Sequence, residues 1–144
     1  MNASSESRSP AVQTLRWTGD RLEMIDQRVL PSRFQYLSCG SAAEVAQAIR
    51  DMAVRGAPAI GCAAAFGVAL EALRSSALPR AQFDLRLTDA FEALARSRPT
   101  AANLFWALSR MKRILAAGAD EPGTEAAKTL LGEAQRIFDE DMEV

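Results

Sequence analysis

The 144-residue chain contains no histidine and only two cysteines, Cys39 and Cys62. It therefore lacks the side chain that most often serves as a general base or as a metal ligand. The two cysteines are too far apart in the sequence to form a CxxC motif or a cysteine-rich metal site. We expect no bound metal and no cofactor, and we interpret each cysteine as a small residue of the hydrophobic core.

A strong net charge is also missing, because 17 Lys and Arg residues face 18 Asp and Glu residues, for a net charge of −1. Without a basic excess to neutralise phosphates, we expect no nucleic-acid partner. The uncharged run Ala57–Leu70 is shorter than the roughly 20 apolar residues that span a membrane. Residues 1–10 are polar and lack the apolar centre of a signal peptide. The sequence thus predicts a disordered tail over residues 1–10 and a cytoplasmic protein with no membrane partner.

A chain of 144 residues, 49% of them hydrophobic, is typical of a single globular domain with its own core. We place this domain over residues 11–144 and predict an α+β fold. In this fold, a small three-stranded antiparallel sheet precedes a bundle of about five helices. Apolar residues on both sides of Thr18-Gly19-Asp20 indicate a hairpin within Val12–Asp26, and the third strand is predicted at Phe34–Cys39.

The first predicted helix has a clear start, because Ser41 and Glu44 form the Ser-x-x-Glu pattern of a capping box. Apolar residues at helical spacing extend this helix to Val54. Further helices are predicted at Pro58–Arg74, Ala81–Ser97, Thr100–Gly118 with Thr100 as the N-cap, and Gly123–Val144. The last of these ends in acidic residues, which the helix dipole disfavours at a C-terminus, and we interpret it as a truncated helix.

The sequence Arg55-Gly56-Ala57-Pro58 predicts a tight turn that leads into a buried helix. Gly56 can adopt a positive φ angle, and Pro58 suits the first helical position. Free N–H groups at a helix start, the positive end of the dipole and a neighbouring arginine can together bind a phosphate group. The residues alone favour the other interpretation, a buried helix whose arginine simply faces solvent. Arg98-Pro99-Thr100 is a second arginine-bearing turn before a helix.

Several stretches resemble the N-terminal part of the methylthioribose-1-phosphate isomerases, the aldose–ketose isomerases of methionine salvage. The most specific are Arg55-Gly56-Ala57-Pro58-Ala59-Ile60-Gly61 and Arg98-Pro99-Thr100-Ala101-Ala102-Asn103-Leu104. Shorter matches are Leu15-Arg16-Trp17, Asp26-Gln27 with Leu30-Pro31, Ala48-Ile49 through Met52, and Glu140-Asp141. The similarity extends from about Val12 to Val144. The Arg55 stretch also occurs in the regulatory subunits of the translation-initiation nucleotide-exchange complex and in ribose bisphosphate isomerases.

The resemblance implies a small sheet and helix bundle followed by a larger Rossmann-like domain that these residues do not include. It implies that Arg55, Gly56, Ala57 and Arg98 contact a sugar-phosphate substrate, chiefly near its phosphate. It places the catalytic cysteine and the proton-transferring aspartate of the family in the second domain. We therefore assign no catalytic residue to this chain and expect it to be inactive alone. The full-length protein is expected to be a homodimer without a cofactor.

Three functions stay open at this point. The chain is the N-terminal part of the isomerase, or of a ribose bisphosphate isomerase relative. Alternatively, it is a regulatory module that binds sugar or nucleotide phosphates without turnover, like the exchange-complex subunits. In the third alternative, the chain is only a helical segment that is held together by contacts with a partner, and its arginines bind no ligand.

Overall fold

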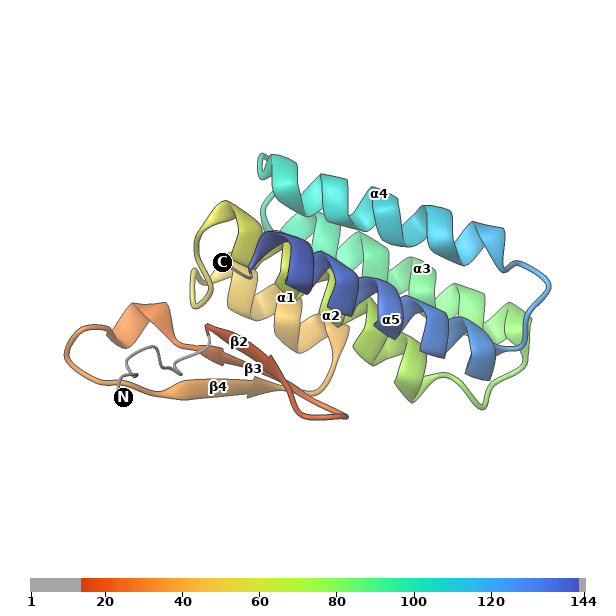
Figure 1. Cartoon of the computed structure of the whole chain (residues 1–144), viewed down its shortest axis with the longest axis horizontal. Coiled ribbons are helices and arrows are strands. Elements are labelled where there is room, and N and C mark those ends of the chain that lie inside the picture. The colour runs from red at the N-terminus through yellow and green to blue at the C-terminus, as the bar shows by residue number, and fades with distance from the viewer. Residues whose placement is uncertain (1–13, 143–144) are drawn as a thin grey trace, which may run out of the picture.

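The computed structural model describes residues 14–142, so the predicted tail over residues 1–10 lies outside the described part of the chain. The described residues have the predicted α+β fold, in which a three-stranded antiparallel sheet packs against five α-helices (Figure 1). The strands are β2 (Leu15–Trp17), β3 (Leu22–Ile25) and β4 (Tyr36–Cys39), with a short 3₁₀ helix η1 (Gln27–Val29) between the last two. The helices are α1 (Ala42–Arg50), α2 (Ala57–Arg74), α3 (Arg80–Ser97), α4 (Ala102–Ala117) and α5 (Gly123–Asp141).

The sheet has the strand order β2-β3-β4 and presents one apolar face to the helices. Its register places Leu15 opposite Met24 and Leu22 opposite Cys39, and all four side chains are buried. Because successive side chains of a strand point to opposite faces, the intervening residues form the outer face. There, Arg16 and Glu23 form an ion pair across β2 and β3.

Helix α2 is the centre of the molecule, since it packs against the other four helices and against β3. Every residue from Ala59 to Leu70 is buried. Small side chains allow the neighbouring helices to approach closely: a Cβ atom on Gly61 would lie only 3.1 Å from the backbone oxygen of Asn103 in α4. By length and composition alone α2 could cross a membrane, but 72% of it is buried inside the protein. The low polarity of α2 is therefore accounted for by its position in the core.

Helix α1 begins as predicted but ends earlier. The Ser41 hydroxyl accepts a hydrogen bond from the Glu44 N–H at 3.2 Å, which confirms Ser41 as the N-cap. The prediction that this helix extends to Val54 is wrong, because α1 ends at Arg50. Met52 adopts a left-handed conformation with φ 65°, and the next N–H, that of Ala53, donates to the oxygen of Ala48 at 2.9 Å. This pattern terminates a helix and is usually built on glycine, so Met52 could not be recognised from the sequence as a helix end.

Other helix ends also differ from the prediction. The N-cap of α4 is Ala101 and not Thr100, because the oxygen of Ala101 accepts the first hydrogen bonds of the helix, from the N–H groups of Leu104 and Phe105. Helix α2 starts one residue before Pro58, and α3 starts at Arg80.

The acidic C-terminal turn of α5 has a partner on α4. Arg110 donates two hydrogen bonds to the Glu140 carboxylate, at 2.7 and 3.0 Å, and a further one to Glu133. Glu133 is only 6% exposed and also accepts from Arg136 at 2.6 Å. The dipole of α5 disfavours negative charge at this end, and the guanidinium of Arg110 offsets that effect. The prediction that α5 is truncated is not tested, since residues 143–144 lie outside the described part.

Candidate phosphate-binding site

The turn before α2 has the backbone geometry predicted for a phosphate site. Gly56 is the N-cap and has φ 93°, a value that residues with a Cβ atom rarely adopt. The first intrahelical bond runs from the N–H of Ile60 to the oxygen of Gly56 at 2.9 Å. The amides of Gly56, Ala57 and Ala59 therefore have no partner within the helix and lie at the positive end of its dipole. No side chain caps this helix start.

The second arginine turn lies between α3 and α4. Arg98 is the C-cap of α3 and is half-buried, and its backbone oxygen accepts a hydrogen bond from the N–H of Ala101 at 3.0 Å. The start of α4 also has no side-chain cap. This turn therefore repeats the features of the first one, an arginine beside an uncapped helix start.

The five helices form a layer beside the sheet, and the fold brings the two turns to the same end of this helical layer (Figure 1). Helices α2 and α4 both begin at this end, whereas α3 and α5 end there. The close approach of Gly61 to the Asn103 backbone fixes the first turn of α4 against the second turn of α2. The structure thus assembles on one end what the sequence separates by about forty residues: the stretch Arg55–Ala57 and Arg98.

The opposite end of the layer provides a comparison. Helices α3 and α5 also begin without a side-chain cap, so an uncapped start is not by itself distinctive. The arginine at that end, Arg80, is fully engaged: it pairs with Asp84 at 2.8 Å and donates to the backbone oxygens of Gly118, at 2.8 Å, and Glu121. Neither Arg55 nor Arg98 forms a side-chain hydrogen bond or ion pair with another residue in the range 14–142. Within this range, neither guanidinium has a carboxylate within 4.0 Å, and Arg55 is exposed to solvent.

The two cysteines do not provide a nucleophile near this end. Cys62 lies one residue beyond Gly61, and both thiols are buried and unpaired. Burial raises the pKa of Cys39 to about 11 and that of Cys62 to about 12. Thiols with such values are protonated at neutral pH and are poor nucleophiles. Within residues 14–142, no three His, Cys, Asp or Glu side chains gather as a metal site would require.

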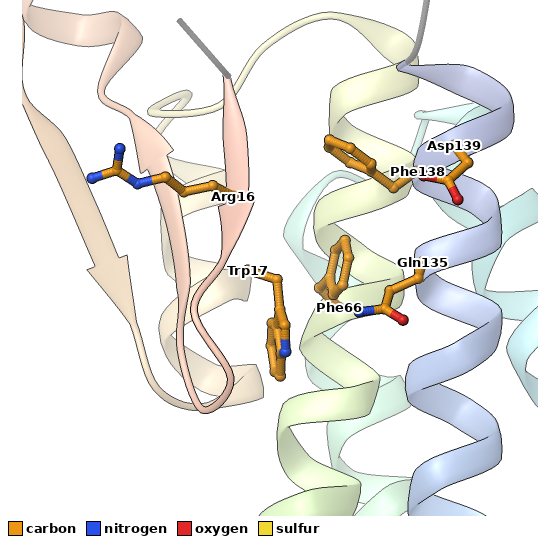
Figure 2. Close-up of a pocket in the computed structure, with 6 residues that line it drawn as sticks. All are labelled: Arg16, Trp17, Phe66, Gln135, Phe138 and Asp139. Atoms are coloured by element: carbon orange, nitrogen blue, oxygen red, sulfur yellow. The ribbon is translucent and has the colours of Figure 1, made fainter. Parts of the chain in front are cut away.

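A pocket of about 300 Å³ lies elsewhere, between β2 and the pair α2 and α5 (Figure 2). It is lined by Arg16, Trp17, Phe66, Gln135, Phe138 and Asp139. The rings of Trp17 and Phe66 stack with centroids 5.4 Å apart, and Phe138 meets Phe66 edge-on at 6.3 Å. These contacts pack the sheet against the helices. None of the four predicted site residues lines this pocket.

A model of the initiation factor 2 subunit family matches residues 53–144, which is more than half of the chain and includes both arginine turns. The chain belongs to this family. Similar relatives are of two kinds, methylthioribose-1-phosphate isomerases and a translation initiation factor subunit. The chain is 54% identical to the methylthioribose-1-phosphate isomerase of Albidiferax ferrireducens, over 93% of this chain and 38% of that protein. It is 51% identical to the protein of the same name from a Synechococcus species, over 92% of this chain and 38% of that one.

Two solved structures have the same fold over the part that this chain covers. The 5-methylthioribose 1-phosphate isomerase of Pyrococcus horikoshii is 43% identical with a TM-score of 0.87, over 90% of this chain and 36% of that one. The translation initiation factor eIF-2B subunit delta of A. fulgidus is 35% identical with a TM-score of 0.84, over 92% of this chain and 38% of that one. The chain thus spans less than two fifths of each of these relatives.

The comparisons agree with the resemblance noted from the sequence motifs, and they leave the roles of the individual site residues as predictions. Asp26-Gln27 stands out in the sequence only as part of a motif. The structure shows that Gln27 is bonded to the segment that leads into the Arg55 turn: its N–H donates to the oxygen of Ala53 at 2.8 Å. A contact between two loops so far apart in the chain leaves no periodic signal in the sequence.

Proposed function

We propose that the chain is the sugar-phosphate-binding N-terminal part of a methylthioribose-1-phosphate isomerase. In this proposal, Arg55, Gly56, Ala57 and Arg98 bind the phosphate, with the backbone amides at the start of α2 as further donors. The observation that carries it is the pair of uncommitted arginines beside two helix starts at one end of the layer, in contrast to the engaged Arg80 at the other. The names of the 54% and 51% identical relatives supply the substrate.

The proposed reaction of the whole enzyme converts the aldose phosphate into the ketose, methylthioribulose 1-phosphate, as a step of methionine salvage. The residues described here supply binding and not proton transfer. There is no histidine in the chain, and both thiols have raised pKa values. We therefore propose that the 144 residues bind the substrate without isomerising it. The whole enzyme is proposed to be a cytoplasmic homodimer.

Titration calorimetry of the purified chain with methylthioribose 1-phosphate tests the binding role. An arginine that forms charge-assisted hydrogen bonds to a phosphate contributes strongly to affinity, and we expect Arg55→Ala and Arg98→Ala each to weaken binding about tenfold or more. Arg86→Ala is the matched control, since this residue is an exposed arginine in the middle of α3. Equal affinity of all four proteins would contradict the proposal. Isomerase activity of the isolated chain would contradict the absence of a catalytic role.

A second function is favoured by the likeness to the eIF-2B subunit delta of A. fulgidus. In that case the same end of the layer binds a sugar or nucleotide phosphate in a regulatory role. The two proposals differ in ligand preference and in turnover. Tighter binding of a nucleoside monophosphate than of methylthioribose 1-phosphate would favour the regulatory function.

A further inference from the structure

Asp26, at the end of β3, is a buried carboxylate that none of the proposed substrate contacts uses. It is only 4% exposed. Both of its oxygens are occupied by Arg28: Oδ1 accepts from the backbone N–H at 3.0 Å and from Nε at 2.9 Å, and Oδ2 accepts from Nη2 at 2.9 Å. This is the bidentate geometry in which arginine binds a carboxylate most specifically. Arg28 lowers the pKa of Asp26 by these hydrogen bonds, against the effect of burial.

The Asp26–Arg28 pair holds a short loop against the segment between α1 and α2. The N–H of Gln27, enclosed between the two paired residues, donates to the oxygen of Ala53 at 2.8 Å. Arg28 Nη1 also lies 4.0 Å from Oδ2 of Asp51, the residue at the end of α1 where that segment begins. Arg55 follows Ala53 by two residues. The loop therefore holds the backbone just before the Arg55–Ala57 turn.

The Asp26–Arg28 pair contributes more to the position of the segment before α2 than to the stability of the fold. The Arg28 side chain is 45% exposed, and pairs with such an exposed partner contribute little net stability. The segment it contacts belongs to no helix or strand, and it contains the left-handed Met52. The N–H groups of Asp51, Met52 and Ala53 bond back to α1, and the side chains of Ala53 and Val54 are buried in the core. The bond from Gln27 to Ala53 adds a tie between this segment and the Asp26 loop, two residues before Arg55.

We propose that Asp26 and Arg28 are positioning residues, which hold the Arg55–Ala57 turn in the orientation that binds phosphate. The inference rests on the proposed phosphate role of that turn. It deepens that role by naming residues outside the site on which the affinity depends. Neither residue touches the ligand; they act through the backbone from Gln27 to Ala53.

The test uses Asp26→Asn in the 144-residue chain. Asparagine keeps the oxygen that accepts from the Arg28 N–H but loses the charge and the second acceptor. Glu23→Gln is the matched control: Glu23 lies on β3, just before Asp26, and also pairs with an arginine, Arg16, at 2.7 Å, but that arginine is on β2 and not in the loop bonded to Ala53. Two readouts are combined. The first is the mobility of the Gln27 and Gly56 amides, from NMR order parameters and hydrogen exchange. The second is the Kd for inorganic phosphate.

For Asp26→Asn we expect amide exchange at Gln27 to be at least about tenfold faster, a more mobile Gly56 amide, and phosphate binding about three- to tenfold weaker. Arg28→Lys keeps the charge without the bidentate geometry and should have an intermediate effect, and it carries the same comparison if Asp26→Asn does not fold. Glu23→Gln should leave both readouts unchanged. A lower melting temperature with unchanged amides and an unchanged phosphate Kd would overturn the positioning role.

The test also separates this inference from the proposed function. If the wild-type chain binds no phosphate while Asp26→Asn still loosens the Gly56 amide, the phosphate role fails and the control of the turn by Asp26 stands. If the wild type binds phosphate and Asp26→Asn changes neither readout, the positioning role fails and the phosphate role stands.

Discussion

Replacing Gly61 by alanine should destabilise the protein, whereas the same replacement at Gly132 should stabilise it. Both glycines lie inside helices, where alanine is favoured over glycine by about 1 kcal/mol. The surroundings differ. A Cβ atom at position 61 would lie 3.1 Å from the backbone oxygen of Asn103 and 3.7 Å from the Cβ of Ala107, whereas one at position 132 would have no neighbour within 4 Å.

The size of the difference follows from what would have to move. The oxygen of Asn103 belongs to the backbone of α4, so relief of the contact requires a shift of this helix by a few tenths of an ångström and not a change of rotamer. Overpacking of a core costs about 1–3 kcal/mol, which exceeds or cancels the helix-propensity gain of about 1 kcal/mol. We expect Gly61→Ala to lower the free energy of unfolding by about 1 kcal/mol and Gly132→Ala to raise it by about 0.5–1 kcal/mol.

Urea denaturation followed by circular dichroism at 222 nm measures both values, provided that the m-value is unchanged. In a domain of this size, the two variants should also differ in melting temperature by several degrees. Equal stabilisation by both substitutions would refute the reasoning. It would mean that α2 and α4 do not approach each other closely at Gly61, and that this contact does not hold the two arginine turns together.

Three further predictions concern side chains whose environment is unusual. Arg110→Ala should lower the free energy of unfolding by about 2 kcal/mol in urea, because Glu133 stays buried without its closest partner; a loss below about 0.5 kcal/mol would contradict this. The small loss of stability expected for Asp26→Asn should be fully present at neutral pH and should shrink in acid. The folded-state pKa of Asp26 lies below the ordinary 3.8, so its contribution is present above that value and disappears as the pH falls through the folded-state pKa. Urea midpoints from about pH 7 down to about pH 2 measure this, and a parallel pH dependence of the two proteins would contradict it. Cys39 and Cys62 should react with a disulfide reagent at about pH 8 only after unfolding, because burial raises both pKa values; rapid labelling of the folded chain would contradict it.

The parts of the fold that could be predicted depend on neighbours in the sequence. The start of α1 needs only Ser41 and Glu44, three residues apart, and the start of α2 needs only Gly56 and the residues that follow it. The three strands and five helices likewise follow from local periodicity and turn residues. These features are local because a capping hydrogen bond or a turn involves residues within one helical turn of each other.

The parts that could not be predicted depend on contacts across the fold or on an unusual residue at a turn. Ala53 and Val54 continue the apolar pattern of α1, and the left-handed turn at Met52 that ends the helix has no glycine to indicate it. The partner of Glu140 is Arg110 on another helix, so the acidic end of α5 could not be explained from its own sequence.

The candidate site divides in the same way. The two arginine turns could be identified from their residues and from the resemblance. The structure was needed to show that they lie at the same end of the layer, and that Asp26 contacts the segment leading into one of them through Gln27.

The two ends of the helical layer are held together by different contacts, and those at one end are made by Arg80. Arg80 binds the turn between α4 and α5 to the start of α3, and a Cβ atom on Gly123 would lie 2.9 Å from the oxygen of Ser76, so this end of the layer allows little relative movement. At the end with Arg55 and Arg98, the close approach of Gly61 to the Asn103 backbone joins α2 to α4, and the Arg110–Glu140 ion pair joins α4 to the last turn of α5. A helix of 18 residues is about 27 Å long, so a tilt of about 2° would move one of its ends by about 1 Å relative to the other. Because both ends of the layer are held, such tilts are restricted, and the two arginine turns keep their spacing without a contact between the arginines themselves.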